Sequence, residues 1–233
     1  MTKFNIKDKV GDIVSIYPAA ADIFMAYNID FCCGGNRPLE VAAQEKAVDA
    51  EKIVDEINNK YEAFLREKLN YEDYTKYSSE ELIDHIINTH HKYLWQEMPI
   101  LSKLTQRILA AHGDKHPELL GKVKKLYEDL RKELEAHLKK EEDILFPLMK
   151  AYEDAKEGKA KDEMLEGIRS LHDEHEAAGN ILKELRKVTH DYELPSDVCS
   201  TFALTYAKLQ EMERDIFLHI HLENNILFKR YEE

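Results

Sequence analysis

The sequence contains two copies of a His-x-x-x-Glu motif, each followed at the same distance by an Ile-Leu-Phe tripeptide. The first copy runs from His137 to Glu141 and the second from His219 to Glu223. Residues four apart lie one turn apart on the same face of an α-helix. Each motif therefore predicts a helix that presents an imidazole and a carboxylate in the same direction.

One further histidine precedes each copy, His91 before the first and His175 before the second. Both continue an apolar helical stripe, so we expect their side chains to point into the protein interior. A buried carboxylate is costly unless it is paired or bound to metal, and the sequence offers no inward lysine or arginine at a matching position. Bound metal ions are the simplest way to compensate the charge of these buried carboxylates. The predicted ligands are His91, His137, Glu141, His175, His219 and Glu223.

These ligands offer nitrogen and oxygen but no thiolate. Such a set suits iron or manganese better than copper(I) or a closed structural zinc site. Two carboxylates can bridge two cations about 3.5–4 Å apart. We therefore predict two non-haem iron ions per chain, held by oxo and carboxylate bridges, with open positions left for a small ligand.

Two other histidines compete for this role. His90 is adjacent to His91, and helical periodicity does not choose between them. His172, three residues before His175, is a weaker competitor. The histidines expected at the surface or at helix ends are His85, His112, His116, His172, His190 and His221.

Cys32 and Cys33 are adjacent and precede two glycines in a predicted turn. Such thiols can act as accessory groups that exchange with other thiols, form a strained vicinal disulfide or bind metal transiently. The alternative is that both are small residues packed under the turn, which the spacing slightly favours because two thiols make an incomplete metal site. Cys199, near the start of the last predicted helix, is expected to be structural.

Four long amphipathic segments between residues 77 and 233 must position the predicted ligands. Ser78 and Glu81 predict a capping box at the start of the first segment, and Pro117 suits the first turn of the second. The apolar stripe of the second segment continues inward through Ile144. Such segments, separated by breaks near residues 113–117, 157–159 and 194–196, predict an antiparallel four-helix bundle. The repeated motif predicts that two helix pairs are related by a pseudo-twofold axis.

Residues 1–70 predict a separate small helical domain. Apolar residues recur at helical spacing from Ile13 to Tyr27, with Pro18 near the start of the helix. The Cys-Cys-Gly-Gly turn follows, and residues 39–50 and 50–68 predict two more short helices. Residues 71–77 predict a linker to the bundle, which occupies residues 77–233.

Composition excludes several classes of protein. Eight glycines and six prolines in 233 residues are few for a turn-rich β fold. A formal net charge of −13 without a basic stripe argues against a nucleic-acid partner. The sequence has no apolar run long enough to span a membrane. Three cysteines and an N-terminus without a signal-peptide core predict a cytoplasmic protein without a disulfide framework.

The sequence resembles the bacterial iron–sulfur cluster repair di-iron proteins, the ScdA family, over nearly its whole length. In the N-terminal part the resemblance rests on the run from Asp30 to Gly35, Asp-Phe-Cys-Cys-Gly-Gly. In the second part, which is similar to haemerythrin, it rests on four motifs. These are Asp84-His85-Ile86-Ile87 with His91, His137-x-x-x-Glu141, His175-Glu-Ala-Ala-Gly179 and His219-x-x-x-Glu223-Asn-Asn.

The resemblance implies that His91 rather than His90 is the ligand and that Glu141 and Glu223 bridge the irons. It implies that the cysteine pair lies in a small helical domain able to approach the di-iron site, and that the protein forms homodimers. It implies repair or protection of iron–sulfur clusters damaged by nitric oxide or oxidative stress, with the damaged proteins as partners. The His-His pair at residues 90–91 departs from the family, where an aromatic residue often precedes a single histidine.

Three other functions compete with this interpretation. A haemerythrin-like carrier or sensor would bind dioxygen or another diatomic ligand reversibly, and would not need Cys32 and Cys33. A ferritin-like oxidase would carry Glu-x-x-His on its helices, whereas this chain has the order His-x-x-x-Glu. A purely structural bundle would leave four inward histidines and two glutamates unexplained.

Overall fold

The computed structural model describes residues 3–66, 72–155 and 159–232, and divides into two compact units. One unit comprises Ile83–Ile216, and the other comprises Met1–Leu82 together with Phe217–Glu233. Within the described ranges there is no β-strand, only an isolated antiparallel bridge between Lys9 and Pro38. The all-α prediction is confirmed. Among the described residues, no helix is long and apolar enough to cross a membrane.

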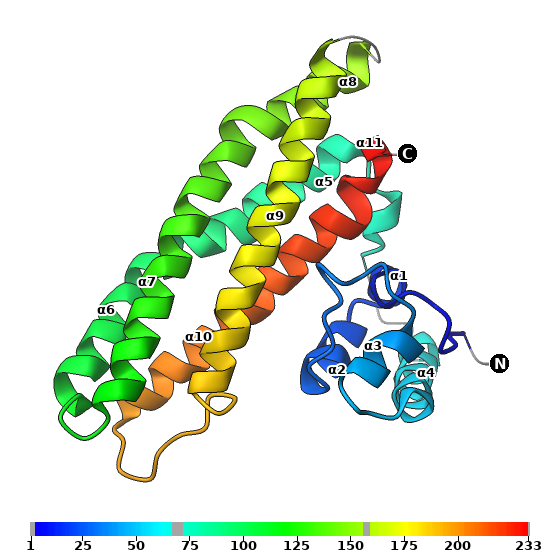
Figure 1. Cartoon of the computed structure of the whole chain (residues 1–233). Helices are drawn as coiled ribbons and strands as arrows, with labels where there is room; N and C mark the ends of the chain where they lie inside the picture. Colours follow the sequence, from blue (N-terminus) through cyan, green and yellow to red (C-terminus); the bar gives the residue numbers. More distant parts are fainter. Residues whose placement is uncertain (1–2, 67–71, 156–158, 233) are drawn as a thin grey trace. The chain divides into compact units, whose positions relative to one another are not determined.

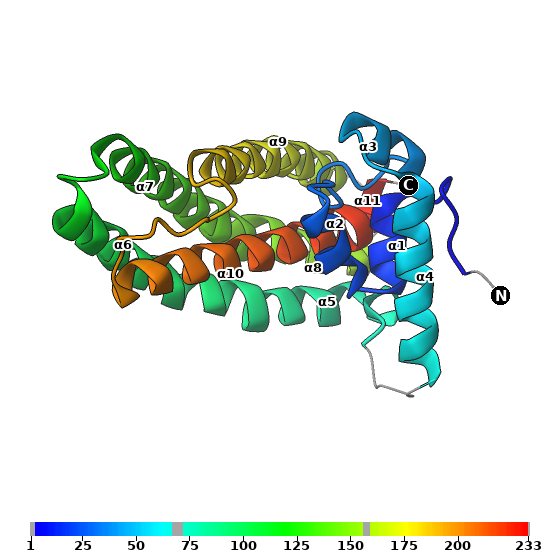
Figure 2. The same ribbon diagram turned by 90° about the horizontal axis from the view of Figure 1, so that it is seen from below.

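The unit Ile83–Ile216 is a bundle of long helices (Figures 1 and 2). It contains the end of α5 (Ser79–Ile86), η2 (Ile87–His91), α6 (Lys92–His112), α7 (Pro117–Lys140), η3 (Glu141–Leu145), α8 (Phe146–Ala155), α9 (Lys159–Val188) and most of α10 (Ser200–Leu222). The views show α6, α7, α9 and α10 side by side.

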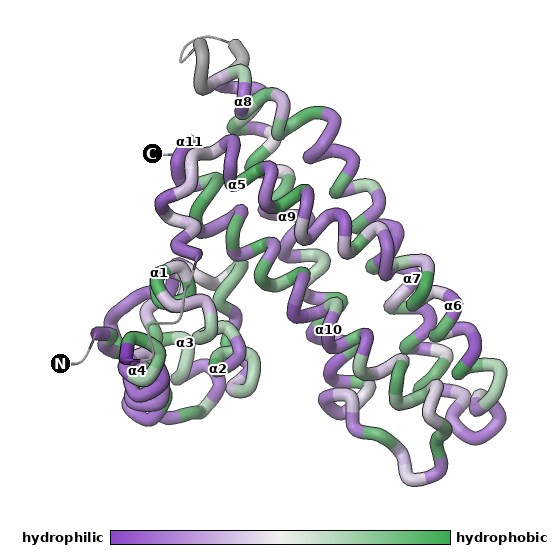
Figure 3. Tube along the Cα trace, turned by 180° about the vertical axis from the view of Figure 1, so that it is seen from behind, coloured by the Kyte–Doolittle hydropathy of each residue, from purple (hydrophilic) through white to green (hydrophobic). Residues whose placement is uncertain are grey.

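Polar contacts join neighbouring helices of this bundle. The Tyr127 hydroxyl on α7 donates to the carbonyl of Met98 on α6 over 2.6 Å. Arg186 on α9 pairs with the buried Glu213 on α10 over 2.7 Å. These contacts supplement an apolar core that includes Leu94, Met98, Leu101, Leu130, Leu134, Leu171, Leu182, Leu185, Phe202, Leu209 and Met212. Each fully buried side chain of this kind contributes roughly 1.5–3 kcal/mol. Figure 3 shows hydrophobic and hydrophilic residues alternating along α7 and α9.

The predicted helix starts are present. The Ser78 and Glu81 side chains cap each other's backbone amides, with Ser78 N donating to Glu81 Oε2 over 2.8 Å and Glu81 N to Ser78 Oγ over 3.2 Å. Pro117 is the first residue of α7, where its missing N–H costs no hydrogen bond. The break predicted at residues 157–159 lies mostly outside the described residues.

The prediction that Ile144 points inward is wrong, because its side chain is 56% exposed. Residues Glu141–Leu145 form η3, a π-helix inserted between α7 and α8. A π-helix has wider turns with i→i+5 hydrogen bonds, so the stripe that α7 sets up does not continue in phase. Leu145, Phe146 and Met149 are buried instead.

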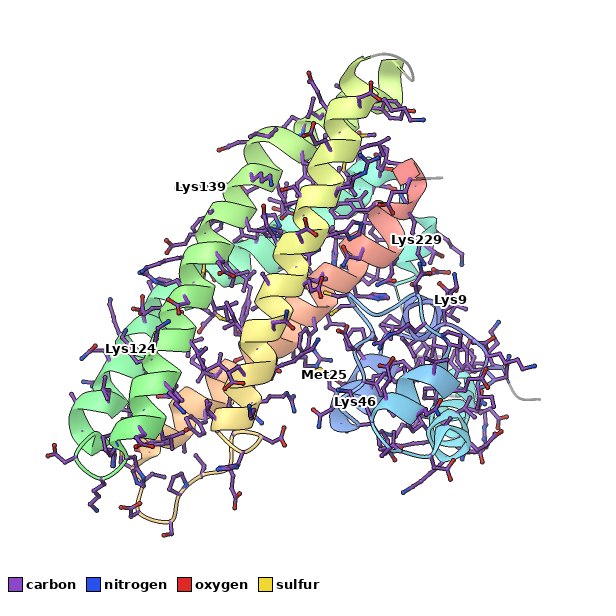
Figure 4. The ribbon with its side chains drawn as sticks, in the orientation of Figure 1. Lys9, Met25, Lys46, Lys124, Lys139 and Lys229 are labelled. Carbon is purple, nitrogen blue, oxygen red and sulfur yellow. The ribbon has the colours of Figure 1, made fainter. Side chains whose placement is uncertain are left out.

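The second unit contains short helices from both ends of the chain. They are α1 (Val10–Ile16), α2 (Ala20–Ala26), α3 (Leu39–Glu45), α4 (Ala50–Arg66), η1 (Tyr74–Lys76), the start of α5, the end of α10, η4 (Glu223–Leu227) and α11 (Lys229–Glu232). The Lys229 ammonium, labelled in Figure 4, donates to Asp12 on α1 over 3.2 Å. The C-terminal residues therefore pack within the same unit as the N-terminal helices.

The helix expected from Ile13 to Tyr27 is divided into two. Helix α1 ends at Ile16, and Tyr17 leaves helical geometry with φ −137° and ψ 85°. Pro18 explains the break, because proline disfavours the α conformation in the residue before it. The next predicted helix, over residues 39–50, ends at Glu45, and the last runs to Arg66. Residues 67–71, which include the start of the predicted linker, lie outside the described residues.

Candidate metal centre

Four predicted ligands come together in the unit Ile83–Ile216. Glu141, at the start of η3, is completely buried. Its Oε2 lies 3.3 Å from Nε2 of His91 on η2 and 3.3 Å from Nε2 of His137 on α7. His175 on α9 directs its Nε2 to Nε2 of His137 at 3.2 Å. Lys139, between His137 and Glu141 in the sequence, is exposed on α7 (Figure 4).

The other two predicted ligands lie together in the second unit. His219, near the end of α10, and Glu223, the first residue of η4, are both buried. His219 Nε2 and Glu223 Oε1 are 2.9 Å apart. The motif thus spans the end of α10 (Ser200–Leu222) and the first residue of η4.

Two partly buried carboxylates orient the imidazoles of the first group. Nδ1 of His91 is 2.9 Å from Glu142 Oε1, and Nδ1 of His137 is 2.9 Å from Glu174 Oε2. The hydrogen bond from His137 and the nearby Lys140 ammonium lower the pKa of Glu174 to about 2. Because an ionised carboxylate can only accept a hydrogen bond, Nδ1 carries the proton, which in the neutral imidazole leaves the lone pair on Nε2.

Nε2 of His91 and Nε2 of His137 thus each direct a lone pair at a carboxylate oxygen. Facing acceptor atoms repel one another, and a cation bound between them removes this repulsion. Metal–ligand bonds of about 2.0–2.2 Å at angles of about 90–110° place ligand atoms about 3.0–3.4 Å apart. The observed separations of 3.2 and 3.3 Å lie within this range. The Nε2 atoms of His137 and His175 also face each other, and at most one of them can donate a hydrogen bond to the other. The donor set therefore fits a metal ion.

A π-helix coincides with a predicted ligand at three places. His91 ends η2, Glu141 begins η3 and Glu223 begins η4. Such π-helical turns occur frequently at functional sites. Both His90 and His91, the last residues of η2, are buried. His91 lies against Glu141, whereas Nδ1 of His90 is 2.9 Å from Asp215 on α10.

His221 lies at the end of α10, as expected, and its side chain is buried. Its Nε2 is 3.4 Å from the hydroxyl of Ser15, and its ring lies 5.9 Å from that of Phe31. Burial lowers the pKa of His221 to about 4, so the imidazole is neutral at pH 7.

Replacing Glu174 with glutamine is expected to weaken metal binding about 10- to 100-fold, the usual cost of losing a carboxylate that orients a ligand histidine. The amide keeps the size of the side chain but removes the charge that fixes the His137 tautomer. A competition titration with a chelator measures the change. Glu176→Gln, at an exposed position on the same helix, is the control. Equal metal affinity in both variants would show that Glu174 does not orient His137 for metal binding.

Cys199, which the sequence predicts to be structural, has an exposed side chain. Its sulfur is 3.2 Å from Nε2 of His112. The hydrogen bond with His112, with smaller contributions from backbone amides of α10, lowers the pKa of Cys199 from 9.0 to about 7.

We expect alkylation of Cys199 to rise with pH around a midpoint near 7, because only the thiolate reacts and it forms above the pKa. Replacing His112 with alanine should move the midpoint toward 9, since the main stabilisation of the thiolate is lost. Mass spectrometry of the Cys199 peptide across pH measures both curves. An unchanged midpoint in the His112→Ala variant would show that His112 does not stabilise the Cys199 thiolate.

Comparison with known proteins yields two family matches. Residues 82–231 match the family described as "Hemerythrin HHE cation binding domain". Residues 6–61 match ScdA_N, described as a domain of unknown function.

Curated relatives match almost end to end. The iron–sulfur cluster repair protein ScdA of Staphylococcus haemolyticus is 35% identical over 95% of this chain and 96% of its own. A probable iron–sulfur cluster repair protein of Haemophilus influenzae is 35% identical over 96% of each chain. The iron–sulfur cluster repair protein YtfE of an Enterobacter species is 34% identical over 95% of this chain and 94% of its own.

Proposed function

This chain belongs to the family of iron–sulfur cluster repair proteins with a haemerythrin-type cation-binding domain, and we propose that it restores or protects clusters damaged by nitric oxide or oxidative stress. Its partners are then proteins whose iron–sulfur clusters are damaged. Similarity over at least 94% of each of these relatives supports the proposal, because no large part of those proteins lacks a counterpart here.

The proposed centre holds two non-haem iron ions, bridged by Glu141 and Glu223. His91, His137, His175 and His219 supply the nitrogen ligands. The family match to a cation-binding domain spans residues 82–231 and so includes all six residues. The observation that carries the proposal is the pair of imidazoles whose Nε2 atoms both face Glu141 Oε2 at 3.3 Å.

The iron pair would supply redox chemistry and open positions for small ligands such as nitric oxide or dioxygen. The residues of the chain have simpler tasks. Glu142 and Glu174 fix the tautomers of His91 and His137. Trp95 donates to Glu142 over 3.3 Å and Lys140 to Glu174 over 2.7 Å, which holds both carboxylates in place. The proposal includes a homodimer as the functional form.

The alternative is reversible binding or sensing of a diatomic ligand, which the match to the haemerythrin domain favours. The two functions make different demands on the N-terminal part of the chain. A carrier needs only the metal ligands, whereas repair would also use the cysteine turn.

Iron analysis and Mössbauer spectroscopy of the purified protein test the centre, with two irons per chain expected. The function is tested by adding the protein to an enzyme whose iron–sulfur cluster has been damaged by nitric oxide. Recovery of that enzyme's activity, beyond recovery with free iron alone, is the expected result. A stable dioxygen adduct without any recovery would favour the carrier.

A further inference from the structure

The cysteine turn carries a third potential ligand that the sequence analysis did not include. Asp30, Cys32 and Cys33 each place one ligand atom within 4.8 Å of the others. The Cys32 thiol donates to Asp30 Oδ1 over 3.3 Å, and its sulfur is 3.9 Å from that of Cys33. Both cysteines are free, so the turn holds two thiols and not the vicinal disulfide considered above.

These distances suit a tetrahedral cation. Metal–sulfur bonds of about 2.3 Å at tetrahedral angles place two sulfurs about 3.8 Å apart, and a carboxylate oxygen bound at about 2.1 Å lies about 3.6 Å from each sulfur. The observed 3.9 Å and 3.3 Å are close to both values. The three groups can bind one ion with only small adjustments of their side chains.

The backbone of the turn is fixed from outside. The Asn225 amide on η4 donates to the carbonyls of Cys32 over 2.9 Å and Phe31 over 3.3 Å. Within the turn, Gly34 N donates to Asp30 Oδ1 over 3.1 Å, and Arg37 Nε donates to the Gly34 carbonyl over 3.1 Å. A turn held in this way loses little conformational freedom when it binds an ion.

We infer that Asp30, Cys32 and Cys33 form a second cation site, which binds one divalent ion of borderline softness such as Fe²⁺ or Zn²⁺. Three protein ligands leave the fourth tetrahedral position open. Cys32 is buried and Cys33 is partly exposed, so the open position can be filled by water or by a thiolate from another molecule. Binding releases the thiol protons to solvent and changes no oxidation state. The site thus suits transient exchange of a cation rather than structural support.

This site goes beyond the proposed function, because its ligands do not include those of the iron pair. Co²⁺ is a suitable probe, since a thiolate–cobalt bond gives a charge-transfer absorption that imidazole and carboxylate ligands do not produce. The reduced, iron-loaded full-length protein is titrated with Co²⁺ and read as a difference spectrum. One additional Co²⁺ per chain with this absorption is the expected result.

Single substitutions show which residues produce the thiolate–cobalt absorption. Cys32→Ser and Cys33→Ser should each remove or strongly reduce it, and Asp30→Asn should weaken Co²⁺ binding about tenfold or more, since a ligand charge is lost. Cys199→Ser is the matched control and should change nothing. Cys33 and Asp30 are only partly buried, so those two variants remain informative if the buried Cys32→Ser fails to fold.

The inference is overturned if no thiolate absorption appears, if it survives in Cys33→Ser, or if only Cys199→Ser removes it. Glu141→Ala separates this result from the proposed function. That variant should lose iron from the dinuclear centre and keep the thiolate–cobalt absorption.

Discussion

Replacing Glu141 with alanine is expected to reduce the bound iron from two ions per chain to one or none and to abolish cluster repair. Glu141 is completely buried, and its Oε2 lies 3.3 Å from the Nε2 atoms of both His91 and His137. Its carboxylate is the negative charge shared by those two ligands. Without it, the imidazoles of two different helices would have to bind dications with no shared anion between them.

Metal analysis and the repair assay measure the loss. Glu133→Ala is the matched control, because Glu133 is an exposed glutamate two turns earlier on α7. Far-ultraviolet circular dichroism should show the same helix content in both variants, since alanine keeps the backbone N–H with which residue 141 donates to the His137 carbonyl at the end of α7. Two irons per chain in Glu141→Ala would remove the bridging role and with it the proposed centre.

The sequence was sufficient to predict the all-α fold and several helix starts. Ser78 and Pro117 mark helix starts through local hydrogen bonding and backbone restriction, and both predictions are confirmed. The His-x-x-x-Glu motifs combine two ligand types at helical spacing, which is also a local property. Their placement in a shared iron centre is the proposal made above.

The prediction for Ile144 failed because the local helix geometry changes. Ile144 is exposed because the π-helix η3 interrupts the regular 3.6-residue periodicity. A π-turn depends on tertiary packing and has no strong local signal. The break at Pro18 is different, because a proline in the sequence itself indicates that a helix ends before it.

Contacts between distant parts of the chain could not be predicted. Glu142 and Glu174 orient histidines on other helices, over 51 and 37 residues of sequence. Asn225 reaches the cysteine turn over 193 residues. In a single sequence these residues look like any others on a partly polar helix face. Only the packed structure shows which residues they contact.

The Asn225 contact leads to the second large expected effect, at Gly11. Gly11 is the second residue of α1, and its N–H donates to the Gly35 carbonyl over 2.9 Å. A Cβ on Gly11 would lie 2.5 Å from Asn225 Oδ1 and 3.0 Å from the Gly35 carbonyl oxygen. Because Asn225 is held by its hydrogen bonds to the cysteine turn, it cannot move away freely.

Gly11→Ala should therefore destabilise the protein by about 1–3 kcal/mol, the usual cost of overpacking, although alanine favours helix by up to about 1 kcal/mol. Gly121→Ala is the matched control, because Gly121 is also near the start of a helix and a Cβ there meets nothing within 4 Å. That variant should be stabilised or unchanged. Chemical denaturation of both variants measures the difference.

A double-mutant cycle identifies the responsible contact. Asn225→Ala removes the side chain that Gly11→Ala would strike, so Gly11→Ala should cost much less in that background, with a coupling of about 0.5–3 kcal/mol. The same cycle with Gly121→Ala should show no coupling. If Gly11→Ala costs the same in both backgrounds, Asn225 does not hold α1 and the cysteine turn together. The turn would then lack the support on which its preorganisation for a cation depends.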